Sequence, residues 1–238
     1  MTKLHVLMKK EEIDEEKIID KVAVVFDVLL ATSTITTALH YGAAAVIPVL
    51  NGEEARKVSG DYPNEETLLV GEYEGKTIEG FLDPNPTALK EVVDGKTMIL
   101  STTNGTVAIK KSSEAKKIYI CTLLNGEAVA NKIATEHQDE TIVVVCSGSS
   151  NQFCLEDFYG AGHLIDSLTK KLVLDLTDSA RAALLFYQGH RETGEDLLSL
   201  SRVGQMLTTY GFSEEVSFIS QKDCFSIVPY FDGEKVLI

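Results

Sequence analysis

The segment VVFDVLLATST (24–34) places one acidic residue, Asp27, at the end of an apolar run, and a turn rich in hydroxyl side chains follows it. An Asp at such a position commonly ends a strand or caps the next helix. The alternative is that the strand delivers its carboxylate to a functional site. The second interpretation requires that other functional side chains lie at the same edge of the sheet, and the first does not.

A second turn, STTNGT (101–106), carries four hydroxyl side chains, one Asn and one Gly ahead of a segment with helical spacing. Free N–H groups at a helix start can bind phosphate, and glycine lets the backbone approach a ligand closely. An ordinary Ser/Thr helix cap is the alternative interpretation. The residues predicted to bind the phosphate here are Thr102, Thr103, Asn104, Gly105 and Thr106.

A third segment, CSGSSNQFCLEDFYGAG (146–162), combines a glycine-containing turn with the acidic pair Glu156 and Asp157 at a helix start. Acidic residues in a first helical turn often interact only with the helix dipole. Oxygen ligands from separate elements, however, are the usual way in which proteins hold Mg²⁺, with water and substrate phosphate completing the shell. Glu72 follows another predicted strand. The sequence therefore predicts a Mg²⁺ site formed by Asp27, Glu72, Glu156 and Asp157.

Several other phosphatase mechanisms lack the residues that they require. A cysteine-dependent phosphatase needs Cys-x5-Arg, and Gln152 stands six residues after Cys146. A phosphatase of the haloacid dehalogenase type needs a second Asp two residues after the nucleophile, where this chain has Leu29. The chain contains no GxSxG, HExxH or GxxxxGK[ST] motif. The residues favour a Mg²⁺-assisted site for a small phosphorylated anion.

The elements that must position these residues are short β-branched runs that alternate with segments of helical spacing. This pattern is typical of an α/β fold with a largely parallel central sheet. In such sheets the turns after the strands gather along one edge, where ligands bind, so we expect the three segments above to converge. The predicted strands are 3–7, 22–26, 44–49, 67–71, 97–101, 117–121 and 141–146.

The last third of the chain has a mainly helical pattern. Helices are predicted over 155–171, 178–190 and 195–211, and a final short strand over 224–231. No linker rich in proline or serine divides the chain. We therefore predict one domain over residues 1–238.

Composition narrows the class of protein. The 238 residues are 44% hydrophobic and 24% charged, and the formal net charge is −14. Such a charge, without a basic stripe, argues against nucleic-acid binding. Four cysteines without a CxxC pair suit a reduced compartment, and no apolar run reaches the ~20 residues of a membrane helix. The acidic start does not resemble a secretory signal. We expect a soluble cytoplasmic protein that does not bind membranes.

At these same turns the chain resembles the 2-phosphosulfolactate phosphatase family. DVLLATSTI is similar to the family's DVLRATTTI, STTNGTVA is similar to TTTNGTRA, and residues 146–162 fit C-x-G-x-x-x-x-F-x-L-E-D-x-x-x-A-G. Near the C-terminus, SRVGQML fits S-R-x-G-x-x-L, and this match includes Arg202.

The resemblance implies a three-layer α/β/α sandwich with a mixed, mainly parallel sheet, Mg²⁺ as cofactor, and a homo-oligomer. It also implies hydrolysis of 2-phospho-3-sulfolactate, or a related phosphorylated hydroxy acid, to the hydroxy acid and phosphate. Asp27 and Asn104 are predicted to be catalytic. The residues predicted to bind substrate are Thr32, Ser33, Thr102, Thr103, Gly105, Thr106, Ser147, Gly148 and Arg202.

Four positions depart from the family pattern, because Leu30, Tyr73, Val107 and Gln152 stand where the family often has Arg. Arginine is the side chain best suited to bind phosphate or sulfonate oxygens in pairs. Two hypotheses therefore remain. The chain is a phosphatase of small phosphorylated hydroxy acids, or it is a diverged member that binds an anionic metabolite without turnover. A role for Asp27 as covalent nucleophile instead of metal ligand also stays open.

Overall fold

The seven apolar runs predicted as strands are strands in the computed structural model, which describes residues 1–238. Runs without polar interruptions form strands that are buried on both faces, and β2, β3 and β8 are buried at every position. The predicted strands correspond to β1 (Thr2–Leu7), β2 (Val22–Phe26), β3 (Ala45–Val49), β4 (Thr67–Tyr73), β6 (Thr97–Ser101), β7 (Lys117–Ile120) and β8 (Ile142–Cys146).

Four further strands complete a single sheet, and one of them lies within the strand predicted over 224–231. They are β5 (Lys76–Thr77), β9 (Leu174–Leu176), β10 (Tyr230–Phe231) and β11 (Val236–Leu237). The strand order is β5-β4-β6-β3-β11-β10-β7-β2-β8-β1-β9. One parallel group is β4-β6-β3 and the other is β7-β2-β8-β1-β9. The antiparallel hairpin β10–β11 lies between the two groups. The sheet is therefore mixed and mainly parallel, as predicted.

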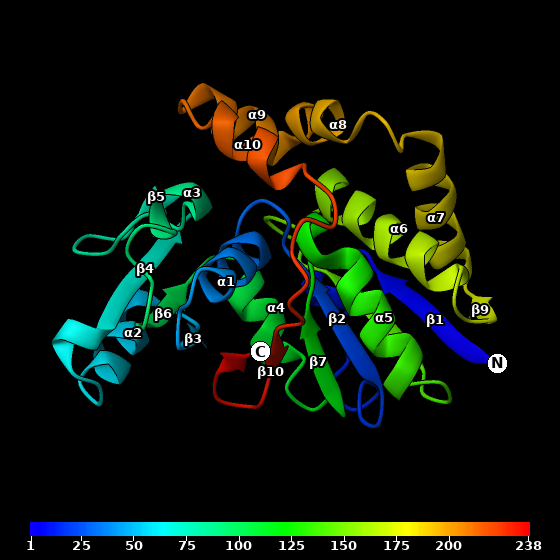
Figure 1. Cartoon of the computed structure of the whole chain (residues 1–238), viewed down its shortest axis with the longest axis horizontal. Coiled ribbons are helices and arrows are strands. Elements are labelled where there is room, and N and C mark those ends of the chain that lie inside the picture. The colour runs from blue at the N-terminus through cyan, green and yellow to red at the C-terminus, as the bar shows by residue number, and fades with distance from the viewer.

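Helices cover both faces of this sheet (Figure 1). Along β2, the side chains of Val22, Val24 and Phe26 enter one hydrophobic core, and those of Ala23 and Val25 enter another. The first core lies under α5 (Gly126–Glu136), α6 (Leu155–Thr169) and α7 (Asp178–Gly189), and the second under α1 (Ala31–His40) and α4 (Gly105–Lys111). The period of two along the strand thus produces the predicted α/β/α layers.

The remaining helices are shorter. The helix α2 (Gly52–Ser59) packs near β4 and β6, and α3 (Pro86–Leu89) packs against α1. Three 3₁₀ turns lie at Lys10–Glu12, Asn64–Glu66 and Leu123–Asn125. Figure 1 shows α8 (Gly194–Leu200), α9 (Arg202–Thr209) and α10 (Ser213–Ile219) grouped along one end of the molecule, above α1 and α6.

The helix predicted over 195–211 is wrong in one respect, because the structure divides it into α8 and α9 at Ser201. This residue has extended backbone angles, φ −64° and ψ 156°. Its hydroxyl accepts a hydrogen bond from the N–H of Gly204 at 3.0 Å and so caps α9. A continuous helix is thereby replaced by two helices at an angle.

The strand predicted over 224–231 is also largely wrong, because only Tyr230–Phe231 is a strand. The rest of this segment runs beside the turn after β7. There the N–H of Phe225 donates to the carbonyl of Leu124, and the N–H of Ile120 donates to that of Pro229. Backbone groups of this segment thus pair with the end of β7 and the turn that follows it, instead of forming a continuous strand.

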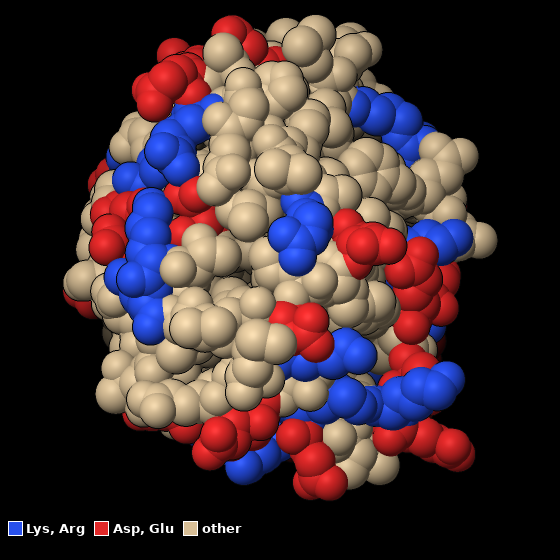
Figure 2. Space-filling view, turned by 90° about the vertical axis from the view of Figure 1, so that its right-hand side faces the viewer, with Lys and Arg blue, Asp and Glu red and all other residues tan.

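Charged side chains of both signs are interspersed on the face of the molecule shown in Figure 2. None of the helices combines the length and the apolar composition needed to span a membrane.

The contact between α6 and α7 generates a stability prediction at Gly162. A Cβ at this position would lie 2.3 Å from the carbonyl oxygen of Ala183. Gly162→Ala should therefore lower the free energy of unfolding by about 2 kcal/mol, although Ala is the better helix former by about 1 kcal/mol. Denaturant unfolding measures the change.

Gly189, the last residue of α7, is the matched control, because a Cβ there would meet no atom within 4 Å. Gly189→Ala should leave the stability unchanged or raise it by up to about 1 kcal/mol. Equal effects of the two substitutions would contradict close packing at Gly162.

Candidate active site

The three segments singled out in the sequence meet in one pocket of about 540 Å³. Asp27 follows β2, the Thr102–Asn104 turn follows β6, and Gly148 follows β8. Glu72, near the end of β4, and the acidic pair at the start of α6 also line the pocket. Arg202 at the start of α9 also lines the pocket. The pocket therefore gathers residues from six separate elements.

The ends of β2 and β8 are neighbours because the two strands pair directly, with Phe26 opposite Cys146. The end of β6 is different, because four strands lie between β6 and β2 in the sheet. Its turn reaches Asp27 through the start of α4. A Cβ on Gly105 would lie 2.6 Å from a carboxylate oxygen of Asp27 and 2.4 Å from the Cβ of Ala31. Glycine is thus required at position 105 for this close approach.

Asp157 positions the ends of two strands. Its Oδ1 accepts a hydrogen bond from the N–H of Val28 at 2.8 Å, and its Oδ2 accepts one from the N–H of Gly148 at 3.0 Å. The side chain is 2% exposed. Burial, followed by the charges of Asp27 and Glu156, raises its pKa well above the usual value. Both oxygens of Asp157 are therefore already engaged with the loops after β2 and β8.

Glu72 has a similar role at the turn after β6. Its Oε1 accepts from the N–H of Thr103 at 2.7 Å, and its Oε2 accepts from the hydroxyl of Thr103 at 3.0 Å and the N–H of Gly75 at 2.8 Å. Of the four carboxylates predicted to bind Mg²⁺, Glu72 and Asp157 thus hold the surrounding loops in place.

Asp27 and Glu156 have more free oxygen atoms. Asp27 is 7% exposed, and the backbone N–H of Gly105 donates to its carboxylate. Burial and the charges of Glu72 and Glu156 raise its pKa to about 7, although Lys10 acts in the opposite direction. Glu156 is 2% exposed, its Oε2 has no hydrogen-bond partner, and burial raises its pKa.

This donor set fits a hard divalent cation held by two carboxylates. A buried carboxylate oxygen without a partner carries a free-energy penalty that a cation would remove. No three His, Cys, Asp or Glu side chains are arranged so that they could hold a metal ion by themselves. Mg²⁺ often binds through one or two carboxylates, with water and substrate oxygens as the other ligands. Asp27 and Glu156 are therefore the residues that would hold Mg²⁺ here.

Lys10 is a residue of the site that the sequence reasoning missed. Its Nζ donates to Oδ1 of Asn104 at 2.8 Å, and it forms an ion pair with Glu11 at 3.1 Å. Because an ammonium group only donates, this bond fixes the Asn104 carbonyl oxygen and leaves the Nδ2 hydrogens free to donate to an anion. In the sequence, Lys10 belongs to the charged run KKEEIDEE, which is typical of a solvated surface.

Arg202 is the only Lys or Arg among the residues that line the pocket. Its guanidinium donates to the carbonyl and hydroxyl oxygens of Ser149, at 3.2 and 3.0 Å, and to Oε1 of Gln152 at 3.3 Å. These partners are neutral, and no carboxylate forms an ion pair with Arg202. Its positive charge is therefore available to a bound anion.

Thr32 and Ser33, predicted to bind substrate, do not line the pocket and are fully buried. The Thr32 hydroxyl donates to the Asp27 carbonyl at 2.9 Å and accepts from the Asp27 N–H at 3.1 Å. The Ser33 hydroxyl donates to the carbonyl of Val28 at 2.8 Å. Both hydroxyls thus shape the turn after β2, and their contact with substrate stays a prediction.

Most N–H groups of the turn STTNGT, predicted to bind phosphate, already have partners in this structure. The N–H of Thr103 donates to Glu72, and that of Thr106 donates to the Thr102 hydroxyl at 3.1 Å. Gly105, Thr106 and Ser147 do not line the pocket. Thr102, Thr103, Asn104 and Gly148 do line it, and Asn104 contributes a free donor.

Comparison with known proteins gives one consistent result. The family model described as "2-phosphosulpholactate phosphatase" matches residues 7–234. A protein of Clostridium acetobutylicum named "Probable 2-phosphosulfolactate phosphatase" is 37% identical over 241 residues, which cover 99% of this chain and all of the relative. Proteins of the same name from Clostridium perfringens and Clostridium kluyveri are 37% and 36% identical and cover 98% and 97% of this chain.

The raised pKa of Asp27 generates a prediction for stability against pH. The pKa rises from 3.8 to about 7 in the folded state, so between these values the native protein binds a proton that the unfolded chain releases. The contribution of Asp27 to stability therefore falls as pH rises through this range. Asp27→Asn should make the protein more stable than the parent at pH 8, by about 2 kcal/mol, and the difference should shrink towards pH 4.

Urea unfolding of the parent and Asp27→Asn at several pH values, in the presence of chelator, measures this difference. A variant that is less stable than the parent at pH 8 would show that the Asp27 charge is stabilised in the native state.

The hydrogen bonds of Asp157 generate a second prediction. Asp157→Asn replaces one acceptor by an NH₂ group that must face a backbone N–H, so stability should fall by about 2 kcal/mol. Glu156→Gln is the matched control, because its Oε2 has no partner to lose. Thermal unfolding of both variants should give a clearly lower Tm for Asp157→Asn alone. Equal Tm values would mean that Asp157 does not hold the two loops.

Proposed function

The chain belongs to the 2-phosphosulfolactate phosphatase family, and we propose that it is a Mg²⁺-dependent phosphatase that hydrolyses a small phosphorylated hydroxy acid. The substrate suggested by the names of its relatives is 2-phospho-3-sulfolactate. The observation that carries the proposal is that Asp27, Glu156, Asn104 and Arg202 all line one pocket. It combines carboxylates that suit a cation with donors that suit a phosphate group.

The reaction is an ester hydrolysis. The oxygen of a water molecule forms a bond to phosphorus while the P–O bond to the organic group breaks. The bonding electrons leave with the ester oxygen, which takes up a proton released by the attacking water. The products are the free hydroxy acid and inorganic phosphate, and no oxidant or reductant is required.

Arg202 and Asn104 are the side chains that bind and orient the phosphate group in this proposal. The guanidinium can donate two parallel hydrogen bonds to phosphate oxygens, and the Asn104 amide adds a neutral donor. Lys10 is a positioning residue, because it determines which atom of the Asn104 amide faces the pocket. When bound to Asp27 and Glu156, Mg²⁺ would neutralise charge on the phosphoryl oxygens and orient the attacking water.

Asp157 and Glu72 contribute through the loops that they hold. Positioning of reacting groups is a large part of catalysis of phosphoryl transfer, because the protein forms few covalent bonds in such reactions. A displacement of Gly148 or Thr103 would move the walls of the pocket relative to Asp27. We therefore expect Asp157 and Glu72 to affect turnover without touching the substrate.

Phosphate release from a panel of phosphorylated hydroxy acids, with Mg²⁺ or with chelator, tests the proposed function. Release should require Mg²⁺, stop on chelation and return when Mg²⁺ is restored. Asp27→Asn should reduce kcat/KM by at least about a hundredfold. Asp175→Asn removes the same charge from an exposed position in β9 and should leave kcat/KM unchanged.

Two other outcomes distinguish the alternatives. Ligand binding without phosphate release from any ester would overturn the proposal in favour of a binding protein. An acid-stable phosphorylated protein, trapped during turnover and absent in Asp27→Asn, would assign Asp27 as the nucleophile and would overturn the metal-ligand role given to it here.

A further inference from the structure

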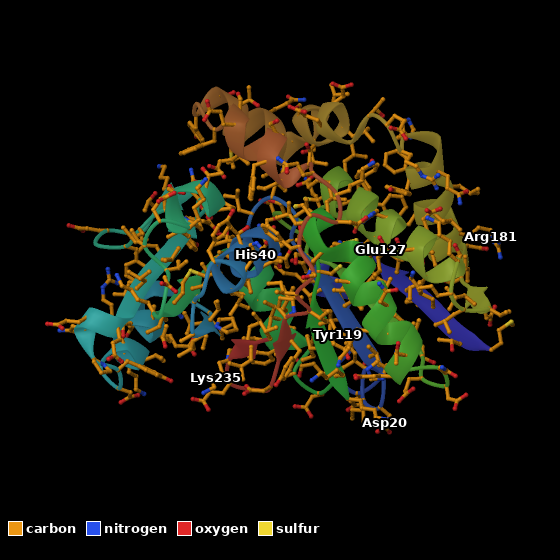
Figure 3. All side chains as sticks on the ribbon, in the orientation of Figure 1. Asp20, His40, Tyr119, Glu127, Arg181 and Lys235 are labelled. Atoms are coloured by element: carbon orange, nitrogen blue, oxygen red, sulfur yellow. The ribbon has the colours of Figure 1, made fainter.

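The charge of the pocket does not suit a substrate with many negative groups. Arg202 is its only lining cation, whereas six acidic residues line it. Other basic residues lie outside: Arg181 on α7 and Lys235 near the C-terminal hairpin are at the outer edges of the molecule, far from α9 (Figure 3). The acidic lining residues are Asp27, Glu72, Glu74, Asp83, Glu156 and Asp157.

A phosphorylated hydroxy acid already carries a phosphate and a carboxylate. The cation at Arg202 can bind one of these groups, and the Asn104 amide supplies a neutral donor. A sulfonate would be a third strong anion, and no further basic side chain lines the pocket. Lys10, which contacts Asn104, does not line the pocket and is already paired with Glu11. Removing such a group from water without a partner is unfavourable.

The pocket also has an apolar wall, formed mainly by α9. Val203, Met206, Leu207 and Tyr210 recur at a spacing of three and four residues along and just beyond α9, and all four line the pocket. This spacing places them on one face of the helix. Leu29 and Leu30 from the turn after β2, and Phe212 just before α10, also line the pocket. Leu207 is buried in the first hydrophobic core, whereas Val203 and Met206 are partly exposed and Tyr210 is exposed, so these three give the pocket an apolar surface that a ligand can contact.

The pocket is also large for a three-carbon acid. Its volume of about 540 Å³ lies within the range of about 300–1,000 Å³ that is usual for drug-sized ligands. A bulky apolar substituent would use both the space and the wall formed by α9. Burial of that substituent would contribute to binding without adding charge.

From the charge of the pocket, its apolar wall and its volume, we infer that the substrate is a phosphorylated 2-hydroxy acid with an apolar side chain in place of a sulfonate. That side chain is branched aliphatic or aromatic. The inference rests on the proposed function and specifies the substrate class of the same pocket. The phosphate and carboxylate lie towards Asn104 and Arg202, and the side chain lies against the face of α9 that carries Val203 and Met206.

The test compares three phosphate esters that differ in one substituent: 2-phospholactate, 2-phospho-3-sulfolactate, and the phosphate ester of 2-hydroxy-4-methylpentanoate. The branched aliphatic ester should have a kcat/KM at least about tenfold above that of the sulfonated ester. An equal or higher value for the sulfonated ester overturns the inference and leaves the phosphatase proposal intact.

If no ester releases phosphate, the proposed function fails, and calorimetry with the same three compounds still decides the substrate class. Tighter binding of the branched aliphatic ester than of the sulfonated one supports the inference. The reverse order, or no binding of any ester, overturns it.

Two variants test the apolar wall directly. Tyr210→Ser should reduce the preference for the branched aliphatic ester over 2-phospholactate by about fivefold, and an unchanged preference would contradict the role of α9. Leu185→Ser in α7 is the matched control, because Leu185 and Tyr210 are both 61% exposed and only Tyr210 lines the pocket.

Leu30→Arg adds a cation to the pocket and so tests whether the lack of basic side chains disfavours a sulfonated substrate. This variant should raise kcat/KM for the sulfonated ester about tenfold relative to 2-phospholactate. No change in this ratio would mean that the lack of basic side chains does not determine which substituent is accepted.

Discussion

The two hydrogen bonds that Asp157 accepts, from the N–H groups of Val28 and Gly148, join the loops that follow two neighbouring parallel strands. The positions of several residues that line the pocket depend on these two hydrogen bonds. They fix the backbone directly after Asp27, and they also hold the loop whose Ser149 and Gln152 bind Arg202. Since Asp157 is the third residue of α6, the same contact sets the position of that helix relative to the sheet. One carboxylate thus links two strand ends, a helix and the single basic side chain of the pocket.

Such an arrangement places negative charges close together and away from water, which opposes folding. The raised pKa values of Asp27, Glu156 and Asp157 express this opposition. Protein cores normally avoid it, and such a cluster in a concave site is typical of functional residues. The two well-packed cores on either side of the sheet supply the stability that the site lacks.

The central strands could be predicted from sequence because unbroken apolar β-branched runs permit few other structures. The meeting of Asp27 with the loop after β8 could also be predicted, since it follows from the positions of these residues after strands. The approach of the turn at Asn104 has a different cause, because four strands separate β6 from β2 and the contact is made through Gly105 at the start of α4. The individual roles could not be predicted. That Glu72 and Thr32 bind backbone groups, and that Lys10 reaches Asn104 across 94 positions of sequence, depends on side-chain hydrogen bonds between distant segments. The break at Ser201 had a local signal, a Ser three residues before a Gly, but helical spacing on both sides concealed it.

The hairpin β10–β11 occupies the centre of the sheet, although it is formed by residues 230–237, the last strands in chain order. During synthesis on a ribosome, the strands on both sides of it emerge first, and β3 and β7 then have an open edge each. An exposed strand edge can pair with another chain. The sheet becomes continuous only after this segment has left the exit tunnel. The time between translation of β8 and translation of the hairpin is therefore the interval in which the nascent chain is most open to aggregation and to chaperones.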